Sequence, residues 1–186
     1  MQISRVLLIK PAYEDSLYNF DDLPAGLGYI SHALDESSIE NWIFDMKIDG
    51  DLDSLYQMIE ERAPQLIGLS LMSYRFLDHY SLMDNIKERF PHILIVVGGP
   101  HLSLYREDVL RRCSAVDFGV VLEGDETIVE LCNNIDNLSE VKGLIYRVSS
   151  PNDVGIADTG DRLAFIQDLE KDRPGKVTKI KEMRFY

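Results

Sequence analysis

The chain contains little cysteine, no long apolar run and few basic residues for its length. Two cysteines occur among 186 residues, neither clustered nor at ligand spacing from a histidine, so we expect neither a disulfide framework nor a zinc site. The longest apolar stretches, residues 66–72 and 93–97, are far shorter than the roughly 20 residues that span a bilayer. No signal segment is recognisable at the N-terminus. These absences together predict a cytoplasmic protein.

Basic residues are heavily outnumbered by acidic ones. The chain has 19 Lys and Arg against 32 Asp and Glu, which gives a formal net charge of −13. A field of this sign repels phosphate backbones and anionic lipid headgroups, so neither nucleic acid nor a membrane is an expected partner. The remaining composition, 45% hydrophobic and 27% charged, is that of one globular domain with a short appendage.

Short β-branched runs alternate with segments whose apolar residues recur at helical spacing. The pattern predicts five strands, at residues 6–9, 39–44, 66–71, 93–97 and 116–122. Strands joined by helical crossovers wind right-handed. We therefore expect a doubly wound α/β fold with a mostly parallel five-stranded sheet in the flavodoxin-like order 2-1-3-4-5.

After residue 137 the pattern changes from alternating strands and helices to a hairpin. Residues 143–148 and 154–157 read as two strands around a turn-forming Ser-Pro-Asn-Asp, which predicts a β-hairpin at the sheet edge. The predicted division is a binding domain at 1–148, followed by the end of the hairpin and a linker or tail at 149–186.

Several residues are candidates for the starts of helices. Pro24 suits the first position of the first helix, whereas Asp51, Ser103 and Asp125 are predicted to cap the second, fourth and fifth helices through their side-chain oxygens.

The loop after the first strand excludes several common ligands. Residues 10–16 contain no glycine, whereas dinucleotide-binding turns, P-loops and flavodoxin-type sites all need glycine there so that the backbone can approach a phosphate. The third strand ends in Ser-Leu-Met-Ser without an acid. A phosphate-accepting receiver site is therefore not expected.

Three glycine-containing segments lie where a sheet of this type binds ligands, at the carboxyl ends of its strands. Residues 98–101 read Gly-Gly-Pro-His, which indicates either bare backbone under a ligand or a tight turn. Residues 123–126 read Glu-Gly-Asp-Glu, a helix cap or part of a site. Two glycines within 24–30 predict a close neighbour, which is either another backbone or a ligand.

Catalytic patterns are missing from the sequence. The four histidines are dispersed, and only His101 falls on the expected binding edge, where a hydrogen-bonded role is favoured over metal ligation. No nucleophile–base or acid–acid pair has a diagnostic spacing. The residues alone therefore predict a binding module before an enzyme.

Taken together, these segments resemble one family, the N-terminal cobalamin-binding domains of B12-dependent radical SAM proteins, which include methyltransferases and the anaerobic magnesium-protoporphyrin ester cyclase. The resemblance covers residues 5 to about 162. It is carried by the order and spacing of the segments 6–11, 23–30, Asp45, 64–70, 96–101, 123–127, 142–147 and 161–162.

The resemblance implies a corrinoid on the carboxyl edge of the sheet, with its nucleotide tail threaded between strands and its benzimidazole displaced from cobalt. The double glycine would make room for the tail, and two serines would hydrogen-bond it. The implied cofactor-binding residues are Pro11, Tyr13, Gly26, Ser70, Met72, Ser73, Gly98, Gly99, Pro100, His101, Glu123 and Gly124.

Two family motifs are absent. The D-x-H-x-x-G motif of mutase-type domains is missing after the first strand, so no histidine of that loop is expected to ligate cobalt. The C-x-x-x-C-x-x-C motif that holds a [4Fe–4S] cluster and S-adenosylmethionine is also missing. Radical chemistry is not expected to start on this chain. The implied partner is a radical SAM barrel, supplied downstream in the same protein or by another subunit.

Two alternatives remain open on the sequence. An acidic docking or oligomerisation module would keep the fold without a cofactor. A small enzyme acting on a sugar or nucleotide would use Glu123 or Asp125 as an acid or base.

Overall fold

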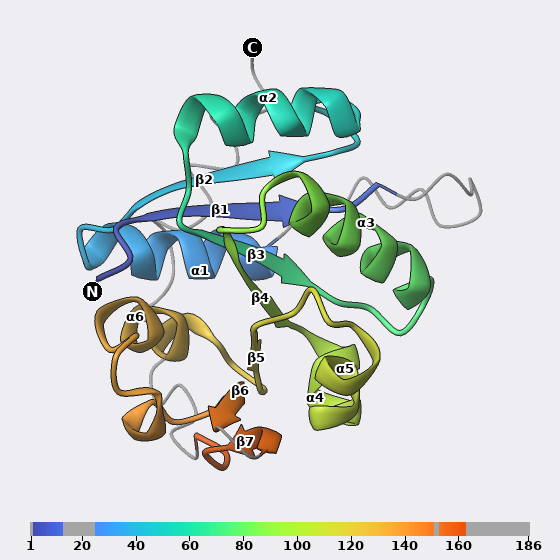
Figure 1. Cartoon of the computed structure of the whole chain (residues 1–186). Coiled ribbons are helices and arrows are strands. Elements are labelled where there is room, and N and C mark those ends of the chain that lie inside the picture. The colour runs from blue at the N-terminus through green and yellow to red at the C-terminus, as the bar shows by residue number, and fades with distance from the viewer. Residues whose placement is uncertain (1, 13–24, 151–152, 163–186) are drawn as a thin grey trace.

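The computed structural model describes residues 2–12, 25–150 and 153–162 (Figure 1). Two residues singled out above, Tyr13 and Pro24, lie outside this part, as do residues 163–186 of the predicted tail.

The described residues form one seven-stranded sheet with helices on both faces. The strands are β1 (Arg5–Lys10), β2 (Glu40–Asp45), β3 (Leu66–Ser70), β4 (Leu94–Gly98), β5 (Phe118–Val120), β6 (Leu144–Ser150) and β7 (Asp153–Asp158). The helices are α1 (Ala25–Glu36), α2 (Leu52–Arg62), α3 (Phe76–Arg89), α4 (Pro100–Tyr105), α5 (Glu107–Arg112) and α6 (Asp125–Asn133), with a 3-10 turn, η2 (Leu138–Glu140).

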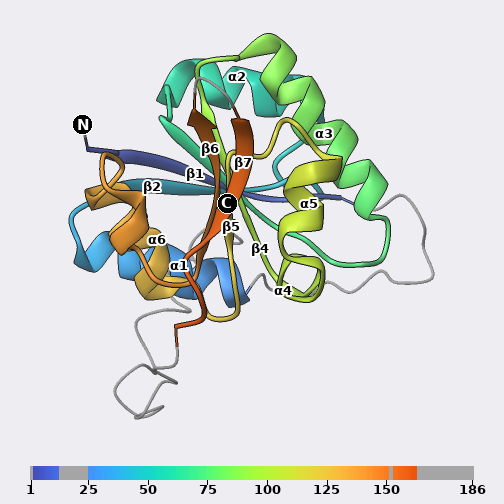
Figure 2. The ribbon, with the colours of Figure 1, turned by 60° about the horizontal axis from the view of Figure 1, so that its bottom comes forward.

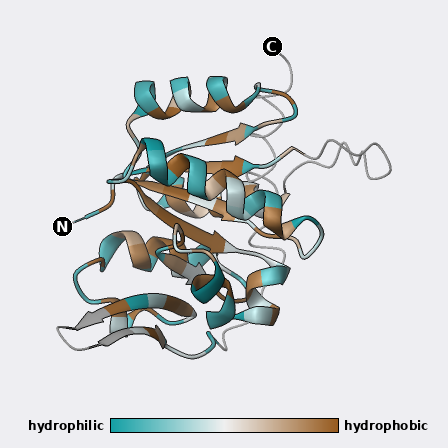
Figure 3. Ribbon diagram, turned by 45° about the vertical axis from the view of Figure 1, so that its right-hand side comes forward, coloured by the Kyte–Doolittle hydropathy of each residue, from teal (hydrophilic) through white to brown (hydrophobic). Residues whose placement is uncertain are grey.

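The sheet order is β2-β1-β3-β4-β5-β6-β7. The first five strands pair in parallel, and β6 and β7 add an antiparallel hairpin next to β5. The predicted order 2-1-3-4-5 with an edge hairpin is confirmed. β1, β3 and β4 are covered on both faces, which accounts for their nearly continuous apolar sequences (Figure 3).

The two faces of the sheet carry different helices. α1 and α6 cover one face, and α2, α3, α4 and α5 cover the other (Figure 2). Successive residues of a strand point to opposite faces. Leu8 and Val96 accordingly pack under α1 and α6, while Ile67 and Ile95 pack under the other four helices.

One of the predicted helix caps is confirmed and two are wrong. Asp51 caps α2 by accepting a hydrogen bond from the Ser54 amide at 3.1 Å. Ser103 lies inside α4, because Gly99 turns the chain at a positive φ of 91° and the helix begins at Pro100. Asp125 is the first helical residue of α6 rather than its cap, and its carboxylate is placed in the acid-favouring first turn.

The hairpin and the residues after it are bonded to the body of the domain. The Gly143 amide donates to the Gly160 carbonyl at 2.9 Å. The Arg106 guanidinium pairs with Asp158 at 2.6 Å and with Asp161 at 2.8 Å. The boundary between domain and tail near residue 148 stays a prediction, but the described chain is held to the sheet as far as residue 162.

Two findings bear on the composition arguments. Both cysteines, Cys113 and Cys132, are free and buried, as expected of small apolar residues. Burial raises the pKa of the Cys132 thiol to about 12. In the described part of the chain, no helix is both long and apolar enough to cross a membrane.

Candidate functional site

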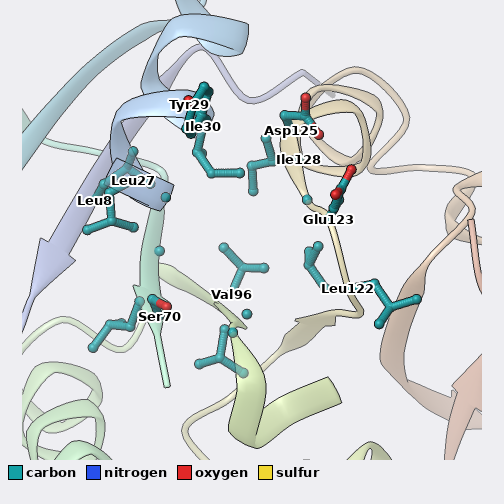
Figure 4. A pocket seen from close by; sticks show the side chains of 18 residues that line it. Leu8, Leu27, Tyr29, Ile30, Ser70, Val96, Leu122, Glu123, Asp125 and Ile128 are labelled. Atoms are coloured by element: carbon teal, nitrogen blue, oxygen red, sulfur yellow. The ribbon is translucent and has the colours of Figure 1, made fainter. Parts of the chain in front are cut away.

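A cavity of about 400 Å³ opens on the α1/α6 face of the sheet, at the carboxyl ends of its central strands (Figure 4). Its lining comes from β1, β3, β4 and β5, from the first two turns of α1 and the first turn of α6, and from the loop that joins β5 to α6. The volume falls within the range of small-molecule sites. Its place, outside the carboxyl ends of strands in a doubly wound sheet, is where such folds bind ligands.

The floor of the cavity is formed by β3 and β4, which carry three small residues there: Gly68 and Ser70 on β3, and Gly98 on β4. In the parallel register, Gly68 of β3 pairs with Val96 of β4, and Ser70 pairs with Gly98. All four residues line the cavity, since positions two apart on a strand face the same side. Side chains the size of leucine at these positions would fill the space. Glycine and serine leave it open.

The walls of the cavity are apolar. Leu27 and Ile30 enter from α1, and Ile128 enters from α6 on the opposite side (Figure 4). Leu8 and Val120 complete the sides from β1 and β5. A planar apolar group inserted here would be removed from water on both of its faces, which is favourable at about 25 cal/mol per Å² of buried apolar surface.

The two adjacent glycines do different things. A Cβ built on Gly98 would make only ordinary contacts, at 3.6 and 4.0 Å to Val120, so the bare backbone there leaves room in the cavity. Gly99 has a φ of 91°, and a Cβ on it would lie 2.7 Å from the Ser70 hydroxyl and 2.9 Å from the Leu71 carbonyl oxygen. Gly99 therefore makes the predicted tight turn, while Gly98 leaves bare backbone along the cavity; a ligand over that backbone stays a prediction.

The mouth of the cavity combines an apolar residue with acids. Leu122 is 52% exposed and has a positive φ of 60°, an outlier for a bulky residue. Its amide donates a hydrogen bond to the Ser103 hydroxyl at 2.9 Å, which holds this turn against α4. The Glu123 and Asp125 side chains lie at the same opening (Figure 4). Among the described lining residues there is no lysine, arginine or histidine.

Six of the twelve residues expected to bind a cofactor line this cavity. They are Gly26, Ser70, Gly98, Gly99, Glu123 and Gly124. Five others lie outside the lining. Pro11 is buried just after β1, Met72 and Ser73 are exposed in the loop between β3 and α3, and Pro100 and His101 begin α4.

His101 belongs to the face of the sheet opposite the cavity. Its ring stacks on Phe76 with centroids 4.8 Å apart. Its Nε2 lies 3.3 Å from the Tyr80 hydroxyl, and its Nδ1 lies 3.2 Å from the Ser73 hydroxyl. Burial, followed by the charge of Arg112, lowers its pKa. These contacts join α4 to α3 and to the loop after β3. His101 therefore helps to fix the position of α4 at the carboxyl edge of the sheet, on the face opposite the cavity.

Sequence reasoning missed most of the apolar lining. The lining residues that it did not name as candidates are Leu8, Leu27, Tyr29, Ile30, Gly68, Leu69, Val96, Val97, Val120, Leu122 and Ile128. One signal was available, because Gly68 and Ser70 are small residues two apart in a buried strand and must face the same side. Nothing in the sequence shows that α1 and α6 leave a gap above that side.

Comparison with known proteins identifies similar chains. A family model described as "B12 binding domain" matches residues 18–132. An uncharacterized methyltransferase of Pyrococcus horikoshii is 24% identical over 148 residues, which cover 78% of this chain and 32% of that protein. The anaerobic magnesium-protoporphyrin IX monomethyl ester cyclase of Synechocystis is 30% identical over 105 residues, which cover 54% and 20% of the respective chains. The chain thus spans a third or less of these relatives.

Solved structures with the same fold include a cobalamin-dependent S-adenosylmethionine radical enzyme, OxsB, and a radical S-adenosylmethionine methyltransferase, TsrM. OxsB, determined with aqua-cobalamin and S-adenosylmethionine bound, superposes with a TM-score of 0.75 at 18% identity and covers 98% of this chain and 26% of its own. The methyltransferase TsrM of Kitasatospora setae gives a TM-score of 0.68 at 20% identity, covering 81% and 29%. At these identities the likeness is one of fold.

Proposed function

Since this chain belongs to the B12-binding domain family, we propose that it binds cobalamin at the carboxyl edge of its sheet, with the nucleotide tail in the cavity between α1 and α6. The observation that carries the proposal is the open apolar cavity above Gly68, Ser70 and Gly98. Its volume of about 400 Å³ suits a heterocyclic base with its sugar rather than a whole corrinoid. The corrin ring would then lie outside, over the mouth.

The chemistry of the lining fits such a tail. The apolar side chains of Leu27, Val96 and Ile128 would contact the faces of the base, and the Ser70 hydroxyl would hydrogen-bond a polar atom of the tail. At the mouth, the carboxylates of Glu123 and Asp125 would accept hydrogen bonds from the amide groups around a corrin. The same acids would repel a free nucleotide, whose phosphates carry more negative charge.

A base held in the cavity would not ligate the cobalt, so we propose a base-off mode. The first loop offers no histidine to replace it. The remaining candidates Pro11, Met72, Ser73 and Pro100 stay proposed contacts around the corrin rather than in the tail cavity. His101 is 4% exposed and packs against Phe76 and Tyr80 on the opposite face, so its proposed part is to position the edge rather than to touch the corrin. Bound cobalamin would supply a cobalt centre able to carry a methyl group. The chain's own part would be to hold and orient it.

We further propose that the reaction, a methyl or group transfer or a cyclisation, takes place on a radical SAM domain in cis or in trans. Two cysteines cannot supply the three thiolates of that cluster motif, so this chain would not be catalytic alone. Any [4Fe–4S] cluster and S-adenosylmethionine would belong to the other domain. The cytoplasm remains the expected compartment, supported by two free, buried thiols.

The proposal is tested by titrating the purified protein with hydroxocobalamin and with methylcobalamin. We expect saturable one-to-one binding and a visible spectrum of the base-off type. Absence of any bound corrinoid at high micromolar concentration would contradict the proposal. In that case a concentration-dependent self-association measured by sedimentation would favour the alternative of an acidic docking module.

A further inference from the structure

The lining of the cavity has a second consequence, which concerns the choice among corrinoids. Natural corrinoids share the ring but differ in the base of the nucleotide tail, which is either a benzimidazole, with a mainly hydrocarbon edge, or a purine such as adenine. Resting on the proposed function, we propose that this cavity selects a corrinoid with a benzimidazole-type base over one with an adenine base.

The polarity of the cavity changes with depth. Its floor and walls are built from buried apolar side chains, Leu8, Leu27, Val96, Val120 and Ile128. Its acidic side chains, Glu123 and Asp125, lie at the mouth, where Glu123 is exposed (Figure 4). Ser70, at the carboxyl end of β3, carries the only side-chain hydroxyl of the described floor. The other hydroxyl of the described lining belongs to Tyr29 of α1, whose side chain is 41% exposed.

An inserted adenine would lose more hydrogen bonds than a benzimidazole. Adenine carries an exocyclic amino group with two N–H donors and further ring nitrogens that accept hydrogen bonds in water. One serine hydroxyl cannot satisfy this set. The strand backbone below is already paired within the sheet, through the registers of β1, β3 and β4. Buried donors left without partners are costly, whereas the methyl-bearing edge of a benzimidazole gains by leaving water.

The experiment compares three corrinoids by spectral titration of the same protein. These are cobalamin, its analogue with adenine in place of dimethylbenzimidazole, and cobinamide, which lacks the nucleotide. We expect the adenine analogue to bind at least tenfold more weakly than cobalamin, and cobinamide at least a hundredfold more weakly. If the dissociation constants of cobalamin and its adenine analogue differ by less than tenfold, the inference is overturned and the proposed function still stands. Failure of all three to bind overturns the proposed function itself.

A pair of isosteric variants assigns the selectivity to the cavity. Val96→Thr replaces a methyl group by a hydroxyl on the floor and offers a hydrogen-bonding partner to adenine. The ratio of the dissociation constants of the adenine analogue and cobalamin should therefore decrease at least threefold. Val121→Thr makes the same change on the other face of the sheet, outside the lining, and should leave the ratio unchanged. A ratio that does not respond to Val96→Thr, or that responds equally to Val121→Thr, contradicts the assignment to the cavity floor. Circular dichroism confirms that both variants are folded.

Discussion

The two faces of the sheet are made by the same strands and yet differ in how completely they are filled. On the face under α2, α3, α4 and α5, β3 and β4 present Ile67, Leu69, Ile95 and Val97, all nearly inaccessible to solvent. On the face under α1 and α6, the same strands present two glycines, a serine and one valine along the cavity. The cavity described above lies on the second face.

This difference shows that stability and binding are encoded by alternate residues of the same strands. The filled face gains from close packing, and any loss of volume there is expected to destabilise the fold. The open face forgoes that packing at Gly98, where an added Cβ would make only ordinary contacts, and the rest of the core is large enough to stabilise the fold. Substitutions on the two faces should therefore separate into those that lower stability and those that lower affinity.

The largest effect is expected when the open face is filled. In Gly98→Leu, the added Cβ makes only ordinary contacts with Val120, and the rest of the side chain enters the cavity. We expect cobalamin affinity to fall at least a hundredfold, about 2.7 kcal/mol, while the free energy of unfolding changes by less than about 1 kcal/mol, as for a typical substitution without strain. Spectral titration and urea denaturation measure the two quantities.

The neighbouring residue supplies the control for this prediction. Gly99→Ala places a Cβ 2.7–3.0 Å from atoms of Ser70 and Leu71 at a backbone angle that only glycine readily adopts. This variant should lose about 3 kcal/mol of stability. If Gly98→Leu proves as destabilising as Gly99→Ala, the face under α1 and α6 has no room for a side chain at residue 98. The proposed difference in packing between the two faces would then be wrong.

A smaller effect distinguishes two consecutive valines. Val121 lies in the core of the filled face and is 1% exposed, whereas Val120 borders the cavity. Val121→Ala should cost about 2–3 kcal/mol, because it leaves a new void in a packed core. Val120→Ala should cost about 1 kcal/mol, because the lost methyl groups already face open space, but it should weaken cobalamin binding severalfold. Equal losses of stability in the two variants would show that the faces are packed alike.

Much of this organisation could be predicted from the sequence. The continuous apolar runs at 66–71 and 93–97 marked central strands covered on both faces, and the change of pattern after residue 137 marked the hairpin. These predictions held because they depend on local periodicity. The glycine-containing edge segments were also placed correctly, since parallel strands bring their carboxyl ends to one edge.

The sequence could not assign each residue of that edge to a face. Alternation between faces ends where a strand ends, and the positive φ of Gly99 redirects the chain, so that Gly98 lines the cavity while His101 packs on the other side. The cap predicted at Ser103 was wrong because the fourth helix begins earlier, at Pro100. In the fold, the Ser103 hydroxyl accepts a hydrogen bond from the amide of Leu122, 19 residues away. No local sequence pattern predicts a contact between residues so far apart.

The last predicted effect concerns pH and belongs to the filled face. His79 of α3 is 2% exposed, and burial lowers its pKa from 6.5 to about 4. Between these two values the unfolded chain binds a proton that the folded chain does not, so stability is complete above pH 6.5 and decreases as the pH falls towards 4. At pH 5 the loss should be about 2 kcal/mol relative to pH 7.5. Urea denaturation at the two pH values measures it.

A matched variant and a binding measurement tie this pH dependence to one face. His79→Gln stays neutral throughout and should remove most of the pH dependence of stability, leaving a remainder from His101, whose pKa is also lowered by burial. Cobalamin affinity of the folded protein should change less than threefold between pH 7.5 and 5, because both histidines pack away from the cavity. An affinity that decreases in parallel with stability in the wild type, but not in His79→Gln, would mean that protonation of the filled face is transmitted to the open one. The two faces would then be coupled through the strands that they share.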